Sequence, residues 1–145
     1  MGGSENKLTA RLVTELYCSD INISKAFYID ILGFKICYER PDEGFVYLER
    51  QGAELMLDQI EKTRTWLKGE LVHPYGRGVN FQIQTDNVDV LYANVQQAGC
   101  EIFLELEEKW YRCDDVHNGN RQFIICDPDG YLLRFFEDLG ERSDV

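Results

Sequence analysis

The hydrophobic residues of this chain alternate between a period of two, typical of strands, and a period between three and four, typical of helices. Two stretches, Leu12–Cys18 and Val79–Thr85, have the strand pattern and stand directly before a helical pattern. The stripes predicted to face the core are Ile23, Phe27 and Ile31 in the first helix, and Val88, Leu91, Tyr92 and Val95 in the second. Each stretch is therefore expected to form a strand followed by an amphipathic helix.

These two strand–helix stretches are copies of one unit. Asp20 and Asp86 follow the strands, and Gly33 and Gly99 lie 13 residues beyond them, so a constant offset of 66 residues relates the halves. Each aspartate, together with the hydroxyl residue before it, is expected to cap its helix N-terminus. Each glycine suits the left-handed position that ends a helix.

Three further strands are expected in each half after the glycine. They are Lys35–Glu39, Gly44–Leu48 and Glu54–Leu57, and then Glu101–Glu105, Arg121–Cys126 and Tyr131–Phe136. The prediction is an α+β fold of two βαβββ modules, residues 8–60 and 79–140, which together form one domain. The linker, residues 61–78, is longer than most connections, so it is expected to be functional or to carry a short helix. Residues 106–120 are expected to be irregular.

Charge narrows the classes of partner. The net charge of −11 argues against nucleic acid and anionic membranes, because both require basic patches. It is compatible with a cationic small molecule, or with solubility alone. No apolar run approaches the length of a membrane span, and the N-terminus lacks a signal-peptide core, so we expect a cytoplasmic protein. The five scattered cysteines are then expected to be reduced.

Strand alternation places a mixed set of side chains on the sheet faces opposite the helices. They are Glu15, Tyr17, Met56, Asp58, Asn80, Gln82, Gln84 and Arg134. Such a face is either a solvated sheet surface or the lining of a small-molecule cleft, which two sheets curled together would enclose. Arg134 is the one charge within its apolar strand, and we expect it to pair with Glu15 or Asp58.

Three segments resemble a known family. "CSDINISKAFYIDILGF", "AELMLDQ" and "DPDGYLLRFFE" are similar to the vicinal-oxygen-chelate superfamily, which includes glyoxalase I, extradiol dioxygenases, and fosfomycin- and bleomycin-resistance proteins. The resemblance covers about residues 8–140. It implies paired βαβββ modules whose sheets curl around a cleft, commonly in a homodimer with shared sites. Whether the modules pair within one chain or are exchanged between chains stays open.

The resemblance also implies four positions at which the metalloenzymes of the superfamily hold a divalent cation. In this chain those positions are Val13, Met56, Asn80 and Arg134, and none is a competent ligand. We therefore expect neither metal nor cofactor. A C-x3-H pair, Cys113 and His117, is the other metal candidate, but a zinc site needs two further ligands and the sequence shows no clear pair to supply them.

The metal-free members that resemble this chain are bleomycin-resistance proteins, which sequester a drug. We expect a homodimer that binds a cationic or aromatic antibiotic without transforming it. The candidates for stacking are Trp66, Trp110, Tyr111 and Tyr17; those for pairing with a cation are Glu15, Asp58, Glu107 and Glu108, while Gln82 and Gln84 would orient polar groups. Three alternatives remain: packing roles for the tryptophans, a divergent lyase, isomerase or dioxygenase-like enzyme with Glu15 and Asp58 as an acid/base pair, and a binder of an unrelated metabolite.

Overall fold

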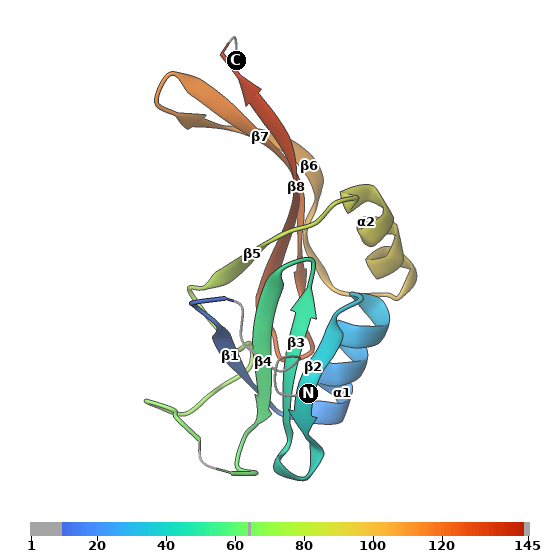
Figure 1. Cartoon of the computed structure of the whole chain (residues 1–145), viewed down its shortest axis with the longest axis vertical. Helices are drawn as coiled ribbons and strands as arrows, with labels where there is room; N and C mark the ends of the chain where they lie inside the picture. The colour runs from blue at the N-terminus through green and yellow to red at the C-terminus, as the bar shows by residue number, and fades with distance from the viewer. Residues whose placement is uncertain (1–9, 64, 144–145) are drawn as a thin grey trace, which may run out of the picture. The chain divides into compact units, whose positions relative to one another are not determined.

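The computed structural model describes residues 10–63 and 65–143, and the chain divides into two compact units between His73 and Pro74 (Figure 1). Unit 1 contains β1 (Thr14–Cys18), α1 (Ile21–Lys25), the π-helix η2 (Ala26–Ile31), β2 (Lys35–Arg40), the 3-10 turn η3 (Pro41–Glu43), β3 (Phe45–Arg50) and β4 (Ala53–Gln59). Unit 2 contains β5 (Asn80–Gln84), α2 (Val88–Gln97), β6 (Ile102–Cys113), β7 (Val116–Cys126) and β8 (Leu132–Arg142). No helix in the described ranges is long and apolar enough to cross a bilayer.

Both units have the same sheet topology. The strand order is β1-β4-β3-β2 in unit 1 and β5-β8-β7-β6 in unit 2, each a four-stranded sheet. The first and last strands of each unit pair in parallel, and the remaining pairs are antiparallel. The predicted repeat of two βαβββ modules in an α+β fold is therefore confirmed.

The core of unit 1 is aromatic. Tyr28 is fully buried and makes edge-to-face contacts with Phe27 and Phe34, with ring centroids 5.3 and 5.6 Å apart. On the strands Val46, Leu48 and Leu57 have no exposed surface. Burial of each such side chain contributes about 1.5–3 kcal/mol to folding, which fixes the helix against one face of the sheet.

Unit 2 packs in the same way around two stacked phenylalanines. Phe123 on β7 and Phe135 on β8 are fully buried, with centroids 5.7 Å apart, and Tyr92 of α2 lies 5.0 Å from Phe123. Val88, Leu91 and Val95 of α2 are buried with them, as the helical stripe predicted. Phe135 faces the helix, so alternation turns Arg134 to the opposite face of the sheet.

The first helix differs from its prediction. Ile23, expected in the core, is 57 % exposed, whereas Ile21, Ser24, Phe27 and Tyr28 are buried. The reason is that α1 passes into a π-helix after one turn. The wider turn accommodates an additional residue and rotates the side chains that follow, so a stripe with a uniform step of four does not describe this helix.

This additional residue also explains why the offset between the two copies of the module changes along the helix. Asp20 caps α1 by accepting hydrogen bonds from the amides of Asn22 and Ile23, as predicted. The cap of α2 is Asn87 rather than the predicted Thr85-Asp86, because the Asn87 side chain accepts from the amide of Val90. The caps are thus 67 residues apart and the helix-ending glycines 66, and the π-helix of unit 1 absorbs the difference.

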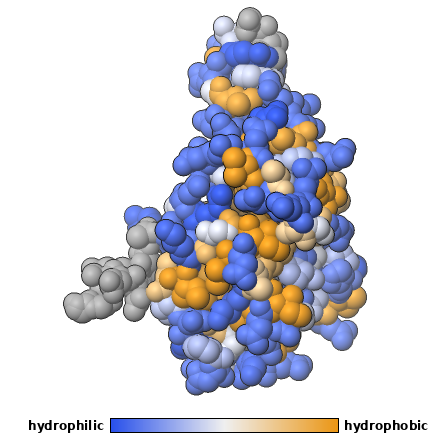
Figure 2. All heavy atoms as spheres, turned by 90° about the vertical axis from the view of Figure 1, so that its right-hand side faces the viewer, coloured by the Kyte–Doolittle hydropathy of each residue, from blue (hydrophilic) through white to orange (hydrophobic). Residues whose placement is uncertain are grey.

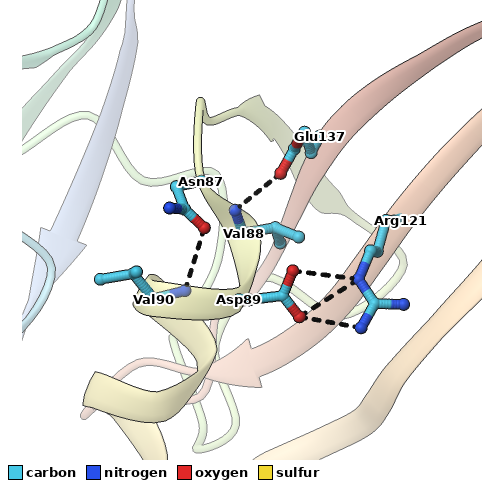
Figure 3. A network of polar contacts seen from close by, with 6 residues as sticks. All are labelled: Asn87, Val88, Asp89, Val90, Arg121 and Glu137. Carbon is cyan, nitrogen blue, oxygen red and sulfur yellow. Dashed lines mark hydrogen bonds and ion pairs between the residues drawn. The ribbon is translucent and has the colours of Figure 1, made fainter.

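The N-terminus of α2 is fastened to the sheet by side chains. Glu137 of β8 accepts a hydrogen bond of 3.0 Å from the amide of Val88, and Arg121 of β7 forms a bidentate pair with Asp89 (Figure 3). Carboxylates near a helix N-terminus also interact favourably with the helix dipole. These contacts fix where α2 lies on the sheet.

The predicted Asp-Pro-Asp-Gly turn forms between β7 and β8. The Asp127 carboxylate accepts hydrogen bonds of 2.9 Å from the amides of Asp129 and Tyr131, and Gly130 has a φ of 95°. A Cβ at Gly130 would lie 2.4 Å from the Cβ of Pro74, so both the positive φ and this close approach favour glycine here. The turn delivers Leu132–Arg142 as one strand, longer than the predicted Tyr131–Phe136.

The prediction that residues 106–120 are irregular is wrong. Strands β6 and β7 pair as far as Cys113 and Val116, so these residues form a long β-hairpin with a turn at Asp114 and Asp115. Most side chains of β6 beyond Glu107 are exposed, and Figure 2 shows mostly hydrophilic side chains at the hairpin end of unit 2. A strand that does not bury one face lacks the alternation by which strands are recognised.

The linker contains no helix in its described residues, 61–63 and 65–78. One hydrogen bond that joins it to unit 1 runs 2.7 Å from the amide of Trp66 to the hydroxyl of Tyr17. The Trp66 side chain is 64 % exposed. Linker residues 61–73 therefore belong to unit 1, and their backbone reaches the sheet face that is free of helix.

Candidate functional site

The helix-free face of unit 1 is made of two rows of side chains that cross the sheet. Strand pairing places Tyr38, Tyr47, Met56 and Glu15 in one row, and Arg40, Phe45, Asp58 and Tyr17 in the next. We call these eight residues the unit 1 face. Sequence alternation identified Glu15, Tyr17, Met56 and Asp58, and the structure brings all four together.

Glu15 and Asp58 are diagonal neighbours on this face. Glu15 lies beside Met56 and Tyr17 beside Asp58 in the parallel pair of β1 and β4, so the two carboxyl groups point to the same side. Burial, and then the charge of Asp58, raises the pKa of Glu15. Burial also raises the pKa of Asp58, while a hydrogen bond from Glu15 and the charge of Arg40 partly oppose this. The pair therefore holds a proton more readily than either carboxyl would alone, with Glu15 as its donor.

Aromatic rings lie beside the carboxyl pair. Tyr38 stacks on Tyr47, with ring centroids 5.4 Å apart and an angle of 12° between the ring planes. The ring centroids of Tyr38 and Phe45 are 5.8 Å apart. The guanidinium of Arg40 sits over the Phe45 ring, 4.0 Å from its centroid. This cation–π contact shows that a ring of the unit 1 face is already paired with a cation of the chain itself, and of the three rings only Tyr38 is not buried.

Sequence reasoning missed the aromatic half of this face. Tyr38, Phe45 and Tyr47 were assigned to strands but not to faces, and Arg40 lay just beyond the predicted strand Lys35–Glu39. The signal was available in the i, i+2 spacing of Phe45 and Tyr47. For Tyr38 it was obscured by the irregularity in pairing between Ile36 and Tyr38.

On the helix-free face of unit 2, Arg134 is held by its neighbour in the parallel strand. Gln82 and Arg134 are register partners, and the Gln82 Oε1 accepts a hydrogen bond from the Arg134 Nη2. Within residues 74–143 no carboxylate forms an ion pair with Arg134, and its buried Nε has no hydrogen-bond partner. The pairing of Arg134 with Glu15 or Asp58 would join the two units, and it stays a prediction.

A cavity of about 720 Å³ lies over this face of unit 2. Its lining includes four side-chain amides, Gln82, Gln84, Asn118 and Asn120, together with Arg134 and Tyr111. We call it the unit 2 cavity. Sequence reasoning predicted Gln82, Gln84, Tyr111 and Arg134 as ligand-binding residues, and the structure places them around one cavity. It missed Asn118 and Asn120, because their segment was expected to be irregular. Asn80 lies on the same face of β5 but outside the lining.

Gln122 organises the wall beside this cavity. It is 2 % exposed, and its Nε2 donates to the Glu107 Oε2 at 2.8 Å and to the Tyr111 hydroxyl at 2.7 Å. Both amide hydrogens are thereby used, and Tyr111 and Glu107 are fixed in place. The Gln122 Oε1 is buried and has no partner among the described residues.

Trp110 lies on the opposite face of the hairpin from Tyr111, as strand alternation requires. Its indole Nε1 donates to Glu108 at 3.2 Å, and the Arg142 guanidinium lies 3.8 Å from the ring centroid. A Cβ at Gly119 would be 2.6 Å from the indole, so the ring packs directly on the backbone of β7. The structure therefore gives Trp110 and Glu108 packing partners and does not bring them to the unit 2 cavity.

The four positions at which a metal would be held do not fit a divalent cation. Val13 has no donor atom, the thioether of Met56 is a soft ligand, and Asn80 offers a weak carbonyl. The fourth position holds the Arg134 guanidinium, a cation. Cys113 and His117 do not form a metal site either, because in the described part of the chain no group of three or more His, Cys, Asp and Glu could hold a metal.

The family model described as "Glyoxalase/Bleomycin resistance protein/Dioxygenase superfamily" matches residues 11–135. A member of that superfamily from Vibrio splendidus 12B01 is 44 % identical over 86 % of this chain and 95 % of its own, with a TM-score of 0.41. No curated protein matches.

Two more distant structures are similar in fold. TioX from Micromonospora sp. ML1 is 21 % identical, covering 90 % of this chain and 99 % of its own, with a TM-score of 0.67. A lactoylglutathione lyase from Agrobacterium tumefaciens is 19 % identical, covering 90 % of this chain and 94 % of its own, with a TM-score of 0.57. At these identities the likeness concerns the fold alone.

Proposed function

Starting from the premise that this chain belongs to the glyoxalase/bleomycin resistance protein/dioxygenase superfamily, we propose that it is a metal-independent small-molecule-binding protein. It sequesters a cationic, aromatic compound of the bleomycin type and does not transform it. The proposal takes the fold from the family and the ligand chemistry from this chain's own side chains.

One observation carries the proposal: the unit 1 face combines a carboxyl pair with stacked aromatic rings. Glu15 and Asp58 supply negative charge, and the half-buried Tyr38, stacked on the buried ring of Tyr47, supplies a ring face. Arg40 already makes one cation–π contact there. A ligand with a flat cationic ring would receive the same two kinds of interaction.

The charges of the whole chain support the same class of ligand. The net charge of −11 raises the local concentration of cations around the protein. Since Glu15 and Asp58 hold protons more readily than usual, a bound cation would favour their ionised forms. We therefore expect the affinity for a cation to increase as the pH rises from 5 to 8.

Bleomycin titration tests the proposal. Binding is followed by calorimetry and by the fluorescence of Trp66 and Trp110 at pH 8. The Glu15→Gln/Asp58→Asn double variant should bind about tenfold more weakly, ~1.4 kcal/mol. Asp30→Asn is the matched control, because Asp30 is an exposed carboxylate on the helix. Neither heat nor a fluorescence change at high micromolar drug would overturn the bleomycin assignment.

A second candidate function, a divergent enzyme of the superfamily, is favoured by the same carboxyl pair. Glu15, whose pKa is raised by burial, lies beside Asp58, and two neighbouring carboxyl groups have the arrangement of a general acid and base. Mass spectrometry of bleomycin after incubation separates the two candidates: an unchanged mass supports sequestration, and a changed mass supports catalysis. If bleomycin does not bind at all, the remaining hypothesis is that the protein binds an unrelated metabolite.

The homodimer and the cytoplasmic location remain part of this proposal. Both rest on the resemblance to the superfamily and on the features of the sequence. Sedimentation equilibrium tests the first, with an expected mass of two chains at micromolar concentration. A fusion to a fluorescent protein, followed by fractionation of the cell, tests the second.

A further inference from the structure

We infer that the end of the β6–β7 hairpin carries an anion site, which holds a phosphoryl dianion on the same side of the sheet as α2. Its residues are Arg112, His117 and Arg142, one on each of three neighbouring strands, and we call them the basic row. They belong neither to the unit 1 face nor to the lining of the unit 2 cavity, so this site is independent of the bleomycin proposal.

Strand pairing aligns the basic row across the sheet. Arg112 of β6 lies opposite His117 of β7, which in turn lies opposite Arg142 of β8. Neighbouring strands place such residues about 5 Å apart, and alternation turns their side chains to the face on which Phe123 of β7 contacts α2. The hairpin extends past α2 (Figure 1), and both arginines of the row are exposed. The row is therefore open to a ligand.

The sheet does not balance the charges of the basic row. On the same face nearer to α2, Glu108, Arg121 and Glu137 alternate in sign across the same three strands. In the basic row two arginines flank a histidine instead, and within the described residues neither arginine forms an ion pair. Glu141, the sequence neighbour of Arg142, points to the opposite face. Unbalanced like charges across strands destabilise a sheet, so a bound anion would stabilise this end of unit 2.

Arg142 is oriented before any ligand arrives. Its guanidinium lies 3.8 Å from the centroid of the Trp110 ring, which packs on the backbone of Gly119 and donates a hydrogen bond to Glu108. A guanidinium that stacks through its face keeps the N–H groups of its edge free to donate. Because the side chain is already held in place, less conformational entropy is lost when it binds an anion.

His117 supplies a second kind of donor between the two arginines. It is half-buried, and its Nδ1 is buried without a hydrogen-bond partner in the described residues. An imidazole has at least one N–H to donate in either charge state. A phosphoryl group has three acceptor oxygens and close to two negative charges, so it can accept from both guanidinium groups and from the imidazole. A carboxylate has two oxygens and one charge, so the row favours the phosphoryl dianion.

Inorganic phosphate is the probe for this site, and Trp110 reports its binding because the Arg142 guanidinium lies on the ring. In Trp66→Phe, which removes the other of the two tryptophans, phosphate added at pH 8 and constant ionic strength should change the fluorescence saturably. Acetate should bind about tenfold more weakly, because it carries one charge less. Methyl phosphate distinguishes the source of the group. Binding as tight as that of phosphate assigns the site to an organic monoester, and much weaker binding assigns it to the free ion.

Two variants connect phosphate to the arginines. By calorimetry, Arg112→Gln and Arg142→Gln should each bind phosphate about fivefold more weakly, as expected for the loss of an exposed ion pair. Lys109→Gln removes an exposed cation on the opposite face of the same hairpin and should bind phosphate as the wild type does. Circular dichroism checks that each variant is folded.

The inference is overturned if phosphate gives no saturable signal at tens of millimolar, or if acetate binds equally well. It is also overturned if the double variant Arg112→Gln/Arg142→Gln is folded and binds phosphate as tightly as the wild type.

Discussion

The carboxyl groups of Glu15 on β1 and Asp58 on β4 lie side by side on the helix-free face of unit 1, and each holds its proton more readily than an isolated carboxyl. A sheet face that serves only as solvated surface tends to separate like charges. The parallel pairing of the first and last strands of the module brings these two together. The same pairing in unit 2 brings Gln82 to Arg134, so one topological rule builds both candidate sites.

Glu15→Gln should stabilise the protein at neutral pH and flatten the dependence of stability on pH. A carboxyl whose pKa is raised by folding contributes stability below its ordinary value, 4.5 for Glu15, and that contribution is lost as the pH rises through the raised value. Because Glu15 is partly exposed, solvent screening limits the gain to roughly 1 kcal/mol or less. Urea unfolding between pH 4 and pH 8 measures it, with Asp30→Asn as control. A variant less stable than the wild type at pH 8 would contradict the like-charge interpretation.

Gly119→Ala should destabilise unit 2 through a clash with Trp110. The added Cβ would lie 2.6–2.7 Å from three indole carbons, so the ring must move away from Arg142 and Glu108. We expect a loss of about 1–3 kcal/mol, typical of overpacking, measured by thermal or urea unfolding. In a Trp110→Leu background the same substitution should cost much less. Equal costs in both backgrounds would show that Trp110 does not pack on Gly119.

Gly130→Ala should cost more than Gly52→Ala, although both glycines have a positive φ, 95° and 91°. At Gly52 a Cβ meets nothing within 4 Å, so the cost is the backbone strain alone, about 1–2 kcal/mol. At Gly130 the Cβ would approach Pro74 to 2.4 Å in addition. The difference in free energy of unfolding, expected to be about 1–3 kcal/mol, measures this contact. Equal losses would mean that the segment at Pro74 moves away without cost.

The sequence was sufficient for the repeated module because both copies bury the same kind of face. Leu133 and Phe135 alternate with Arg134, and Val88, Leu91 and Val95 share one stripe, so strand and helix were identified by burial. The register between the copies was not available from the residues alone. An aspartate stands at the expected cap position of both copies, but the connection from β5 to α2 is one residue longer than that from β1 to α1, so Asn87 rather than Asp86 caps α2.

The sites were predicted in part, and the omissions in unit 2 come mainly from its hairpin. The predicted residues came from strands with one buried face, such as Arg134 of β8 and Asp58 of β4. Asn118 and Asn120 were missed because β6 and β7 continue as a hairpin with much exposed surface, where alternation fades, whereas Gln122 lay within the predicted strand Arg121–Cys126 but was not assigned to a face. Such polar extensions form strands through their pairing with a neighbour, a property that local pattern does not contain.

Purified protein should contain no stoichiometric nickel or zinc, and Arg134→Glu should not create a site for either. Glutamate would supply one carboxylate, but the other positions remain Val13, Met56 and Asn80, which offer no donor, a soft thioether and a weak carbonyl. Elemental analysis measures the metal content of the purified protein. Calorimetric titration measures nickel binding by Arg134→Glu, with Arg112→Glu as control for a new surface carboxylate. Nickel bound tightly and at one equivalent per chain by the wild type would contradict the metal-independent proposal. Tight binding that is specific to Arg134→Glu would show that the scaffold supplies further ligands. In that case the guanidinium alone would separate this chain from the metalloenzymes of its superfamily.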